Sequence, residues 1–390
     1  MQLSERIARI SVSSTAAVVA KADKLKASGV DVVDFGAGEP DFPTPENIKR
    51  AAIRALEENF TKYTPTGGIR DLKQAIVERH AKDFGSDYAA EECLVTVGGK
   101  QAIFEAVAAM INHGDEVILP VPYWVSFLDI INYAGGTPVL LETKEDENFA
   151  AHAEAVERLI TPRTKLVIIN SPANPTGAVT PPEEMEKLLA LAVRRGITLM
   201  SDECYCRFLY DGRRPYSLGC SKNRENLIIV GSLSKTYAMT GWRVGFALGP
   251  AKLLANMLKL QSHSTSNPTS IAQKAGVEAL RGPQDSVATM LAEYERRRDH
   301  IVAELRSIPG LRCPVPEGAF YVYPNVSAYL KKDGIADTTV LATRLLDESQ
   351  VAVVPGPAFG THEHVRISYA TSQEQIEKGV HRMKRFFASL

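Results

Sequence analysis

The chain has 390 residues, of which 45% are hydrophobic and 23% are charged, and its formal net charge is -1. This length favours two domains over one, and the near-neutral charge gives no general attraction to nucleic acid or to an anionic membrane. The first residues lack the basic and apolar regions of a secretion signal, and no apolar run is long enough to span a bilayer. The five cysteines are an odd number, which does not suggest a disulfide framework. We therefore expect a cytoplasmic protein.

The first elements expected along the chain are helices. Residues 5–29 have the pattern of one or two helices, and a structured loop rich in glycine and proline follows them. Thr44 before Pro45 is typical of a helix start, with a capping hydroxyl and a proline at the first helical position. A second amphipathic helix is expected over residues 68–85.

From about residue 94, short apolar runs alternate with helical segments. The runs are LVTVG, EVILP, TPVLLE, KLVIIN, ITLMSDE, LIIVGS and RVGFALG. Such runs predict strands buried on both faces, and their alternation with helices predicts a mostly parallel α/β sheet. Three helical stretches and then a mixed tail of short strands and helices follow, which predicts a large domain of residues 45–310 and a smaller α+β domain formed by residues 1–44 and 311–390.

Polar groups follow several of the predicted strands, where ligands bind in open parallel sheets. The segment from Gly98 to Gln101 joins a strand to a helix, so its glycines allow close backbone approach and its N–H groups suit a phosphate; a simple turn is the alternative. Lys100 is not followed by Ser or Thr, which excludes a P-loop. Gly36 and Gly38 lack the third glycine of a dinucleotide fingerprint.

Two charged residues also lie at predicted strand ends. Asp202 ends an apolar strand, and a buried carboxylate needs a cation, either a protonated pyridine nitrogen or a local arginine such as Arg207. Lys235 lies between Ser234 and Thr236 just after another strand, which suits an amine in a polar cavity; a surface lysine is the alternative.

No metal site is expected. Cys204 and Cys206 flank a single residue, which is not the spacing of a zinc site, so we expect them to pack in the core. His362 and His364 have no cluster of partners in the sequence and are expected in a solvated loop.

Together, the motifs resemble the class I aspartate aminotransferase family, which has fold type I of the enzymes that depend on pyridoxal phosphate (PLP). The resemblance covers nearly the whole chain and rests on AGEPDFPTP, KYTPTGGI, VTVGGKQA, PYWVSF, NSPANPTGAV, SDECY, SLSKTYAMTGWRVG and VRISYATS. It implies the PLP-transferase fold, a PLP cofactor, a homodimer with shared active sites, and amino-group transfer between an amino acid and a 2-oxo acid.

The resemblance also implies roles around the cofactor ring. Lys235 would bind PLP as a Schiff base and transfer the substrate proton, and Asp202 would pair with the ring nitrogen. Tyr205 and Asn174 would bond the phenolic oxygen. Trp124 would stack on the ring, with ordinary core packing as its alternative.

At the cofactor phosphate, the resemblance implies contacts from Ser232, Arg243 and the backbone of Gly99, Lys100 and Gln101. A cationic fork such as the guanidinium group is a strong phosphate donor. Tyr63 would reach the phosphate of the neighbouring subunit.

At the substrate, the resemblance implies that Arg366 clamps the α-carboxylate with a backbone contact from Gly38, beside Trp124 and Asn174. Lys100 is the candidate for a distal carboxylate, which favours aspartate and 2-oxoglutarate as substrates.

The chain departs from the family pattern near its start. Ser11 to Thr15 replace a Lys-Pro-Ser-type segment that covers the substrate side chain, although Ser13 and Thr15 are candidate donors to a carboxylate. Other amino donors (aromatic, alanine or prephenate-type) and a C–S β-lyase therefore remain alternatives. A PLP-binding regulator would need a DNA-binding segment, and no such pattern precedes the domain.

Overall fold

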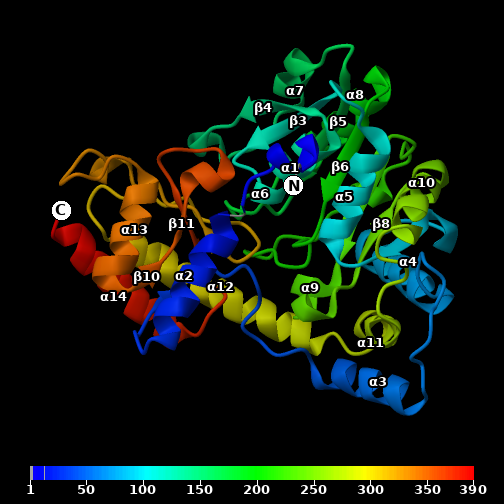
Figure 1. The fold of residues 1–390 in the computed structure, drawn as a ribbon, viewed down its shortest axis with the longest axis horizontal. Coiled ribbons are helices and arrows are strands. Elements are labelled where there is room, and N and C mark those ends of the chain that lie inside the picture. Colours follow the sequence, from blue (N-terminus) through cyan, green and yellow to red (C-terminus); the bar gives the residue numbers. More distant parts are fainter. Residues whose placement is uncertain (1–2, 13) are drawn as a thin grey trace.

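A seven-stranded sheet forms the centre of the fold (Figure 1). In the computed structural model, which describes residues 3–12 and 14–390, its strands lie in the order β2-β8-β7-β6-β5-β3-β4. Only β8 is antiparallel to its neighbours, so the predicted, mostly parallel α/β sheet is confirmed. The strands are β2 (Cys93–Thr96), β3 (Glu116–Val121), β4 (Thr137–Glu142), β5 (Thr164–Asn170), β6 (Thr198–Asp202), β7 (Leu227–Ser232) and β8 (Gly245–Leu248).

Both faces of the sheet are covered by helices, as the unbroken apolar runs predict. Neighbouring strand residues point to opposite faces, so Val117 and Ile228 lie in one core cluster whereas Ile118 and Ile229 lie in another. The first cluster is closed by α5 (Gly99–Met110), α6 (Val125–Ala134) and α10 (Ala251–Ser262), and the second by α4 (Arg70–Phe84), α7 (Ala153–Leu159), α8 (Pro182–Arg195) and α11 (Ser270–Arg281). The helix α3 (Glu46–Glu57) packs on α11.

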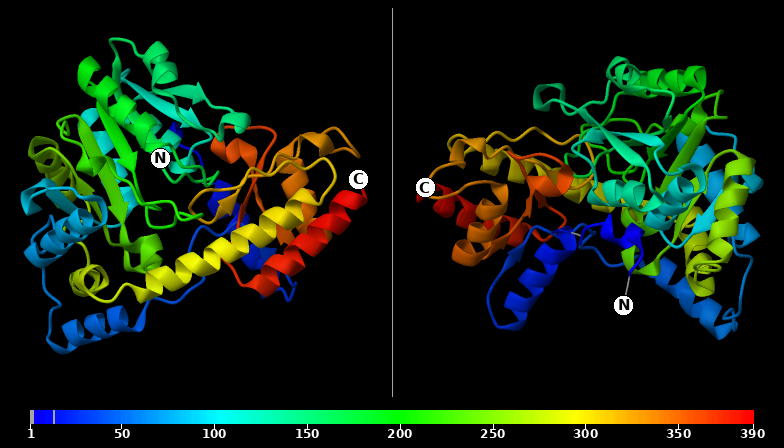
Figure 2. Two further views of the ribbon diagram at one scale, coloured as in Figure 1. Left: turned by 180° about the vertical axis from the view of Figure 1, so that it is seen from behind. Right: turned by 45° about the horizontal axis from the view of Figure 1, so that its top comes forward.

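The N-terminal segment joins the C-terminal part of the chain. β1 (Val33–Asp34) pairs with β10 (Val351–Ala352), and β11 (Val354–Pro355), β12 (Val365–Ser368) and β9 (Tyr321–Val322) form a small antiparallel sheet. Helices α2 (Ser14–Ala27), α13 (Thr338–Ser349) and α14 (Gln373–Ala388) surround these strands, and the long α12 (Asp285–Arg306) runs from the large sheet region into this part (Figure 2). A division into domains at residues 45 and 310 stays a prediction.

The remaining elements are single turns. They are α1 (Glu5–Ala8), α9 (Leu233–Thr236), η1 (Ala90–Glu92), η2 (Glu145–Glu147), η3 (Leu218–Cys220), η4 (Thr240–Trp242), η5 (Ser327–Tyr329) and η6 (Gly356–Phe359). Among the described residues, the helices are all too short or too polar to cross a bilayer.

The predicted cap at Thr44 is wrong. The helix α3 starts one residue later, at Glu46 after Pro45, and no side chain caps it. The Thr44 hydroxyl instead donates to the carbonyl oxygen of Ala238 at 2.5 Å and accepts a hydrogen bond from Trp242 Nε1 at 2.9 Å. These two tertiary bonds satisfy the hydroxyl better than one local cap, and they tie the loop before α3 to the segment that follows Lys235.

Candidate active site

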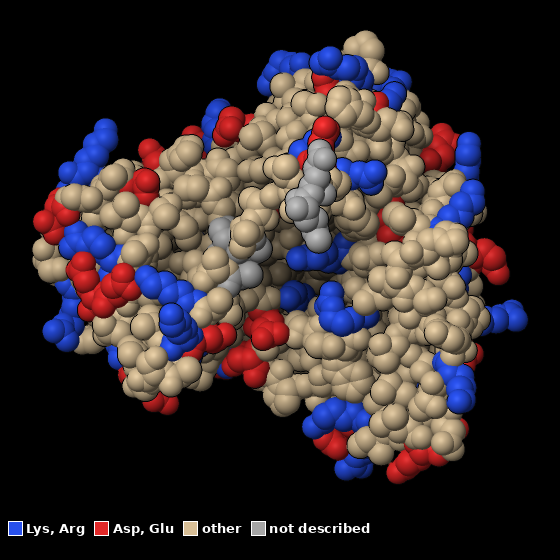
Figure 3. Space-filling view, viewed as in Figure 1, with Lys and Arg blue, Asp and Glu red and all other residues tan. Residues whose placement is uncertain are grey.

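One cavity of about 570 Å³ lies at the carboxyl ends of β5, β6 and β7. It opens into a hollow between the large sheet and the C-terminal part, around which lysine and arginine side chains gather (Figure 3). All but two of the predicted site residues line it, namely Gly38, Gly99, Lys100, Trp124, Asn174, Asp202, Tyr205, Ser232, Lys235, Arg243 and Arg366. The exceptions are Gln101 and Tyr63.

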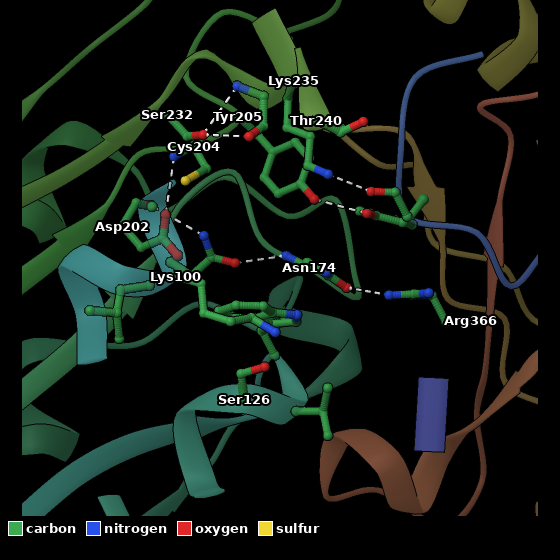
Figure 4. Close-up of a pocket in the computed structure, with 18 of the residues that line it drawn as sticks. Lys100, Ser126, Asn174, Asp202, Cys204, Tyr205, Ser232, Lys235, Thr240 and Arg366 are labelled. Atoms are coloured by element: carbon green, nitrogen blue, oxygen red, sulfur yellow. Dashed lines mark hydrogen bonds between the residues drawn. The ribbon is translucent and has the colours of Figure 1, made fainter. Parts of the chain in front are cut away.

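Lys235 projects into this cavity from α9, directly after β7 (Figure 4). Its Nζ donates to the carbonyl oxygen of Gly38 at 2.5 Å. Burial lowers the pKa of Lys235 to about 8, and the nearby guanidinium groups of Arg366 and Arg243 act in the same direction. The alternative of a surface lysine is therefore wrong. Because the pKa is close to physiological pH, part of the Lys235 population carries a neutral amine, which is the form that can act as a nucleophile or a base.

Asp202 ends β6 and is only 4% exposed. One carboxylate oxygen accepts a hydrogen bond from the backbone N–H of Cys204 at 3.1 Å, and burial raises the pKa of Asp202 to about 6. The alternative partner is excluded, because Arg207 pairs with Asp83 instead. Among the described residues no lysine or arginine forms an ion pair with Asp202, so this buried carboxylate lacks the cation that its environment calls for.

Arg366 lies on β12 and is 1% exposed. Its two terminal nitrogens donate to Asn174 Oδ1 at 2.9 Å and to the carbonyl oxygen of Gly36 at 2.7 Å, while Nε has no partner among the described residues. The guanidinium group lies 4.7 Å from the ring centre of Tyr321 and 5.1 Å from that of Phe359. Burial lowers the pKa of Arg366, but a guanidinium group stays charged in proteins. Its partners here are an amide and a carbonyl oxygen, and no carboxylate of the described part of the chain pairs with it.

Tyr205 and Tyr321 meet at the wall of the cavity. Their hydroxyl groups are 2.8 Å apart, and burial raises the pKa of Tyr205 well above its usual value, so its phenol is protonated. Tyr321 was missed in the sequence, where it is one of several aromatic residues in a short expected strand. Its hydroxyl also lies so close to Gly38 that a Cβ atom there would be 3.1 Å away.

The predicted phosphate-binding groups converge at the start of α5. Gly98 has a φ of +80°, and a Cβ atom at this position would lie 2.3 Å from Arg243 Nη2, so the close approach of the arginine requires glycine. The Ser232 hydroxyl donates to Ser234 Oγ at 2.8 Å on the same side of the cavity. A helix start, a guanidinium group and two hydroxyl groups together suit a dianion.

Gln101 and Tyr63 lie outside this cavity. The Gln101 side chain donates to Glu105 Oε1 at 2.8 Å, and its backbone N–H donates to Gly98 at 3.1 Å within the first turn of α5. Tyr63 is 91% exposed on its own chain. Its suggested contact with a neighbouring subunit stays a prediction.

At the mouth of the cavity, Lys100 Nζ lies 5.0 Å from the ring centre of Trp124. The Trp124 ring lines the cavity and also packs edge-on against Phe127 at 5.3 Å, so it has a core contact as the alternative expected. Its stacking on a cofactor ring stays a prediction. Helix α2 contributes Val19, Ala20 and Asp23 to this rim, which the sequence did not indicate.

In the atypical N-terminal segment, the Ser11 backbone N–H donates to Asp129 of α6 at 3.0 Å. The donors suggested for a substrate carboxylate, Ser13 and the side chain of Thr15, lie outside the described residues.

His364 corrects another expectation, because it is not in a solvated loop. The residue is 7% exposed, its ring stacks on Tyr323 with ring centres 4.8 Å apart, and its Nε2 lies 3.3 Å from Glu145 Oε2. His362 is exposed, as expected. Within the described residues, no group of three or more potential metal ligands comes together.

Comparison with known proteins agrees with this geometry. A family model described as aminotransferase class I and II matches residues 30–383. The chain is 44% identical to the aspartate aminotransferase of Bacillus sp. (strain YM-2), with 98% of each chain covered, and 45% identical to the aspartate/prephenate aminotransferase of Cereibacter sphaeroides, with 100% of this chain and 99% of that one covered. A solved structure of Thermus thermophilus aspartate aminotransferase with maleate superposes with a TM-score of 0.94, at 44% identity and 99% coverage of both chains. The chain therefore belongs to the class I and II aminotransferase family and has its type I fold.

Proposed function

We propose that the protein is a PLP-dependent aminotransferase that transfers the amino group of aspartate to 2-oxoglutarate in two half-reactions. The observation that carries this proposal is the meeting of three groups in one cavity: the amine of Lys235, the buried carboxylate of Asp202 and the buried guanidinium group of Arg366.

The residues present fit PLP. The Asp202 carboxylate, buried without a cationic partner among the described residues, suits a protonated ring nitrogen. The glycine start of α5 with Ser232 and Arg243 suits the phosphate, and the Lys235 amine suits the aldehyde. When bound, PLP supplies that aldehyde, which condenses with amines, and a ring that withdraws electrons from the α-carbon of the amino acid.

The protein groups then have distinct tasks. Lys235 Nζ removes the α-proton of the amino acid as a general base and later returns a proton as a general acid. Asp202 keeps a proton on the ring nitrogen. Tyr205, held protonated by burial, and Asn174 donate hydrogen bonds to the ring hydroxyl oxygen.

Substrate binding follows from the remaining cations. Arg366 receives the α-carboxylate in a bidentate contact, close to Gly38. Lys100, at the exposed mouth, receives the distal carboxylate of aspartate or of 2-oxoglutarate. The names of the relatives support aspartate as the donor.

Prephenate, as the oxo acid that accepts the amino group in place of 2-oxoglutarate, is the second candidate substrate. The relative named aspartate/prephenate aminotransferase, at 45% identity over the whole chain, favours it.

We further propose that residues 45–310 form a PLP-binding domain, with residues 1–44 and 311–390 as the small domain. In a cytoplasmic homodimer, Tyr63 of each subunit completes the phosphate site of the other.

The test is the absorption spectrum of the purified protein, before and after addition of L-aspartate without an oxo acid. We expect the band of the lysine-bound cofactor to give way to that of pyridoxamine phosphate, and 2-oxoglutarate to restore it. A band that aspartate leaves unchanged contradicts the choice of donor, and a panel of amino acids identifies the right one. Release of pyruvate and ammonia from a sulfur amino acid without any acceptor would identify a C–S β-lyase instead.

A further inference from the structure

A single carboxylate outside the cavity connects the large sheet to the C-terminal strands. Glu145 lies in η2, just after β4, and accepts from Asn325 Nδ2 at 2.9 Å. It also contacts His364 Nε2 at 3.3 Å and Arg312 Nε at 3.3 Å. We call these four residues the Glu145 clasp. Figure 1 shows the end of β4 next to the C-terminal segments that carry the three partners.

Two of the partners of Glu145 are buried, so water cannot readily replace its carboxylate. Asn325 and His364 are both buried, and His364 Nδ1 has no partner among the described residues. Burial lowers the pKa of His364, although Glu145 opposes the shift, which favours the neutral imidazole. Of the two ring nitrogens, Nε2 is the one placed to donate to the carboxylate, at 3.3 Å from Glu145 Oε2. Asn325 Nδ2 donates to Glu145 at the shorter distance and also to Glu363 Oε2 at 3.3 Å, whereas His364 Nε2 has Glu145 as its carboxylate partner. Leaving a buried polar group unsatisfied is costly.

The residues after Glu145 are held in the same way. Phe149 packs edge-on against Tyr323 and His364, with ring centres 6.1 Å and 5.6 Å away, and Asn148 Nδ2 donates to Glu317 Oε2 at 3.1 Å. Asn148 and Phe149 have φ angles of +50° and +53°, a conformation that asparagine tolerates but that is unfavourable for a bulky residue such as Phe149. Such a conformation persists only where the surroundings determine it.

A continuous set of contacts links the clasp to Arg366. The His364 ring stacks on Tyr323 with an interplanar angle of 4°, and the Tyr323 ring lies 5.8 Å from Phe359. Phe359 in turn lies 5.1 Å from the guanidinium group of Arg366. Arg366 lies on β12, and His364 lies two residues earlier, immediately before the strand. Extended residues two positions apart point to the same side, so the two side chains share one face.

We propose that Glu145 is a positioning residue for substrate binding: by fixing the C-terminal strands against the segment after β4, it sets the place of the Arg366 guanidinium group. The inference rests on the proposed function, in which Arg366 binds the α-carboxylate. A bidentate contact tolerates little displacement, because both hydrogen bonds depend on one fixed planar geometry.

The test compares Glu145→Gln with Glu147→Gln in the holoenzyme. Glu147 lies in the same turn and loses the same charge. In the part of the chain that the structure describes, its ionic partners are Lys144, at 2.9 Å, and His152, at 3.5 Å. We expect Glu145→Gln to raise KM for both the amino acid and the oxo acid by roughly 2- to 30-fold, with kcat and PLP affinity little changed. Glu147→Gln should behave like the parent. Equal KM values in both variants, or a fall in kcat at constant KM, would overturn the proposal.

Two further measurements separate this proposal from simple destabilisation and from failure of the proposed function. Hydrogen–deuterium exchange needs no turnover: β12 amides should exchange faster in Glu145→Gln than in Glu147→Gln, and equal exchange overturns the clasp even if the parent proves inactive.

In an Arg366→Lys background, Glu145→Gln should add no further rise in KM, because the geometry that it protects is already lost. Full additivity would show that Glu145 acts elsewhere. A parent that transaminates no amino acid overturns the proposed function alone.

Discussion

Replacing Arg366 by lysine is expected to separate substrate binding from cofactor binding. Lysine keeps the positive charge but loses the planar fork, and with it the contacts that Arg366 makes to Asn174 at 2.9 Å and to Gly36 at 2.7 Å. A hydrogen bond to a charged group is worth about 1.5–3 kcal/mol. At 1.36 kcal/mol per tenfold change, loss of one of the two bonds to the carboxylate should lower kcat/KM for the amino acid by roughly 13- to 160-fold.

The cofactor provides the internal control for this prediction. Arg366 binds substrate and not the phosphate in the proposed site, so PLP affinity and the spectrum of the lysine-bound cofactor should change little in Arg366→Lys. Arg344→Lys is the matched control variant, because Arg344 lies at the surface of α13 and pairs with Glu348 at 2.6 Å. Its kcat/KM should equal that of the parent.

The assay is stopped-flow absorbance of the first half-reaction over a range of aspartate concentrations. The thermal stability of Arg366 variants should not follow their activity, because a buried cation that pairs with no carboxylate of the described residues contributes little to folding. Arg366→Met is therefore expected to melt close to the parent. If Arg366→Lys retains the kcat/KM of the parent, or loses PLP in proportion to its activity, then Arg366 is not the carboxylate-binding group.

Three other predictions follow from individual residues. Because the pKa of Lys235 is about 8 and not the usual 10.5, the rate of PLP capture by the cofactor-free protein should rise about tenfold per pH unit and level off above pH 8; a rise that continues to pH 10 contradicts the lowered pKa. Lys100→Ala should lower kcat/KM for aspartate about tenfold but leave that for alanine unchanged, because only aspartate has a distal carboxylate; equal effects on both would remove Lys100 from side-chain recognition. Tyr63→Phe should weaken PLP binding about fivefold, measured by absorbance titration, if the hydroxyl reaches the phosphate of the other subunit; unchanged affinity argues against a shared site.

The sheet and the strand-end part of the site were predictable because both depend on local patterns. KLVIIN and ITLMSDE became β5 and β6, and the parallel arrangement of these strands brings their ends to one edge. Asp202 and the residues around Lys235 met there for that reason. Arg366, which is 131 positions after Lys235 in the printed sequence, could not be placed by periodicity; only its motif, VRISYA, indicated it.

The errors have a common cause in tertiary contacts. Thr44 has the sequence pattern of a cap, yet its partners are Ala238 and Trp242, nearly 200 residues later. His364 lies among polar residues and therefore resembles a loop residue, but Tyr323 and Glu145 enclose it from distant segments. No local pattern encodes such partners, so these side chains could be assigned only from the structure.

The charges of the cavity determine which way a ligand lies in it. Asp202 and Arg366 are buried charges of opposite sign, and they lie on opposite sides of the cavity with Lys235 reaching toward the space between them (Figure 4). They do not neutralise each other directly, because Arg366 is bonded to Asn174 and Gly36 while Asp202 accepts from Cys204. Each charge is stabilised best by a counter-charge from the ligand. In the proposed site, Arg366 would receive a substrate carboxylate and Asp202 would receive the protonated ring nitrogen of PLP, so both buried charges would find a partner on either side of the Lys235 amine.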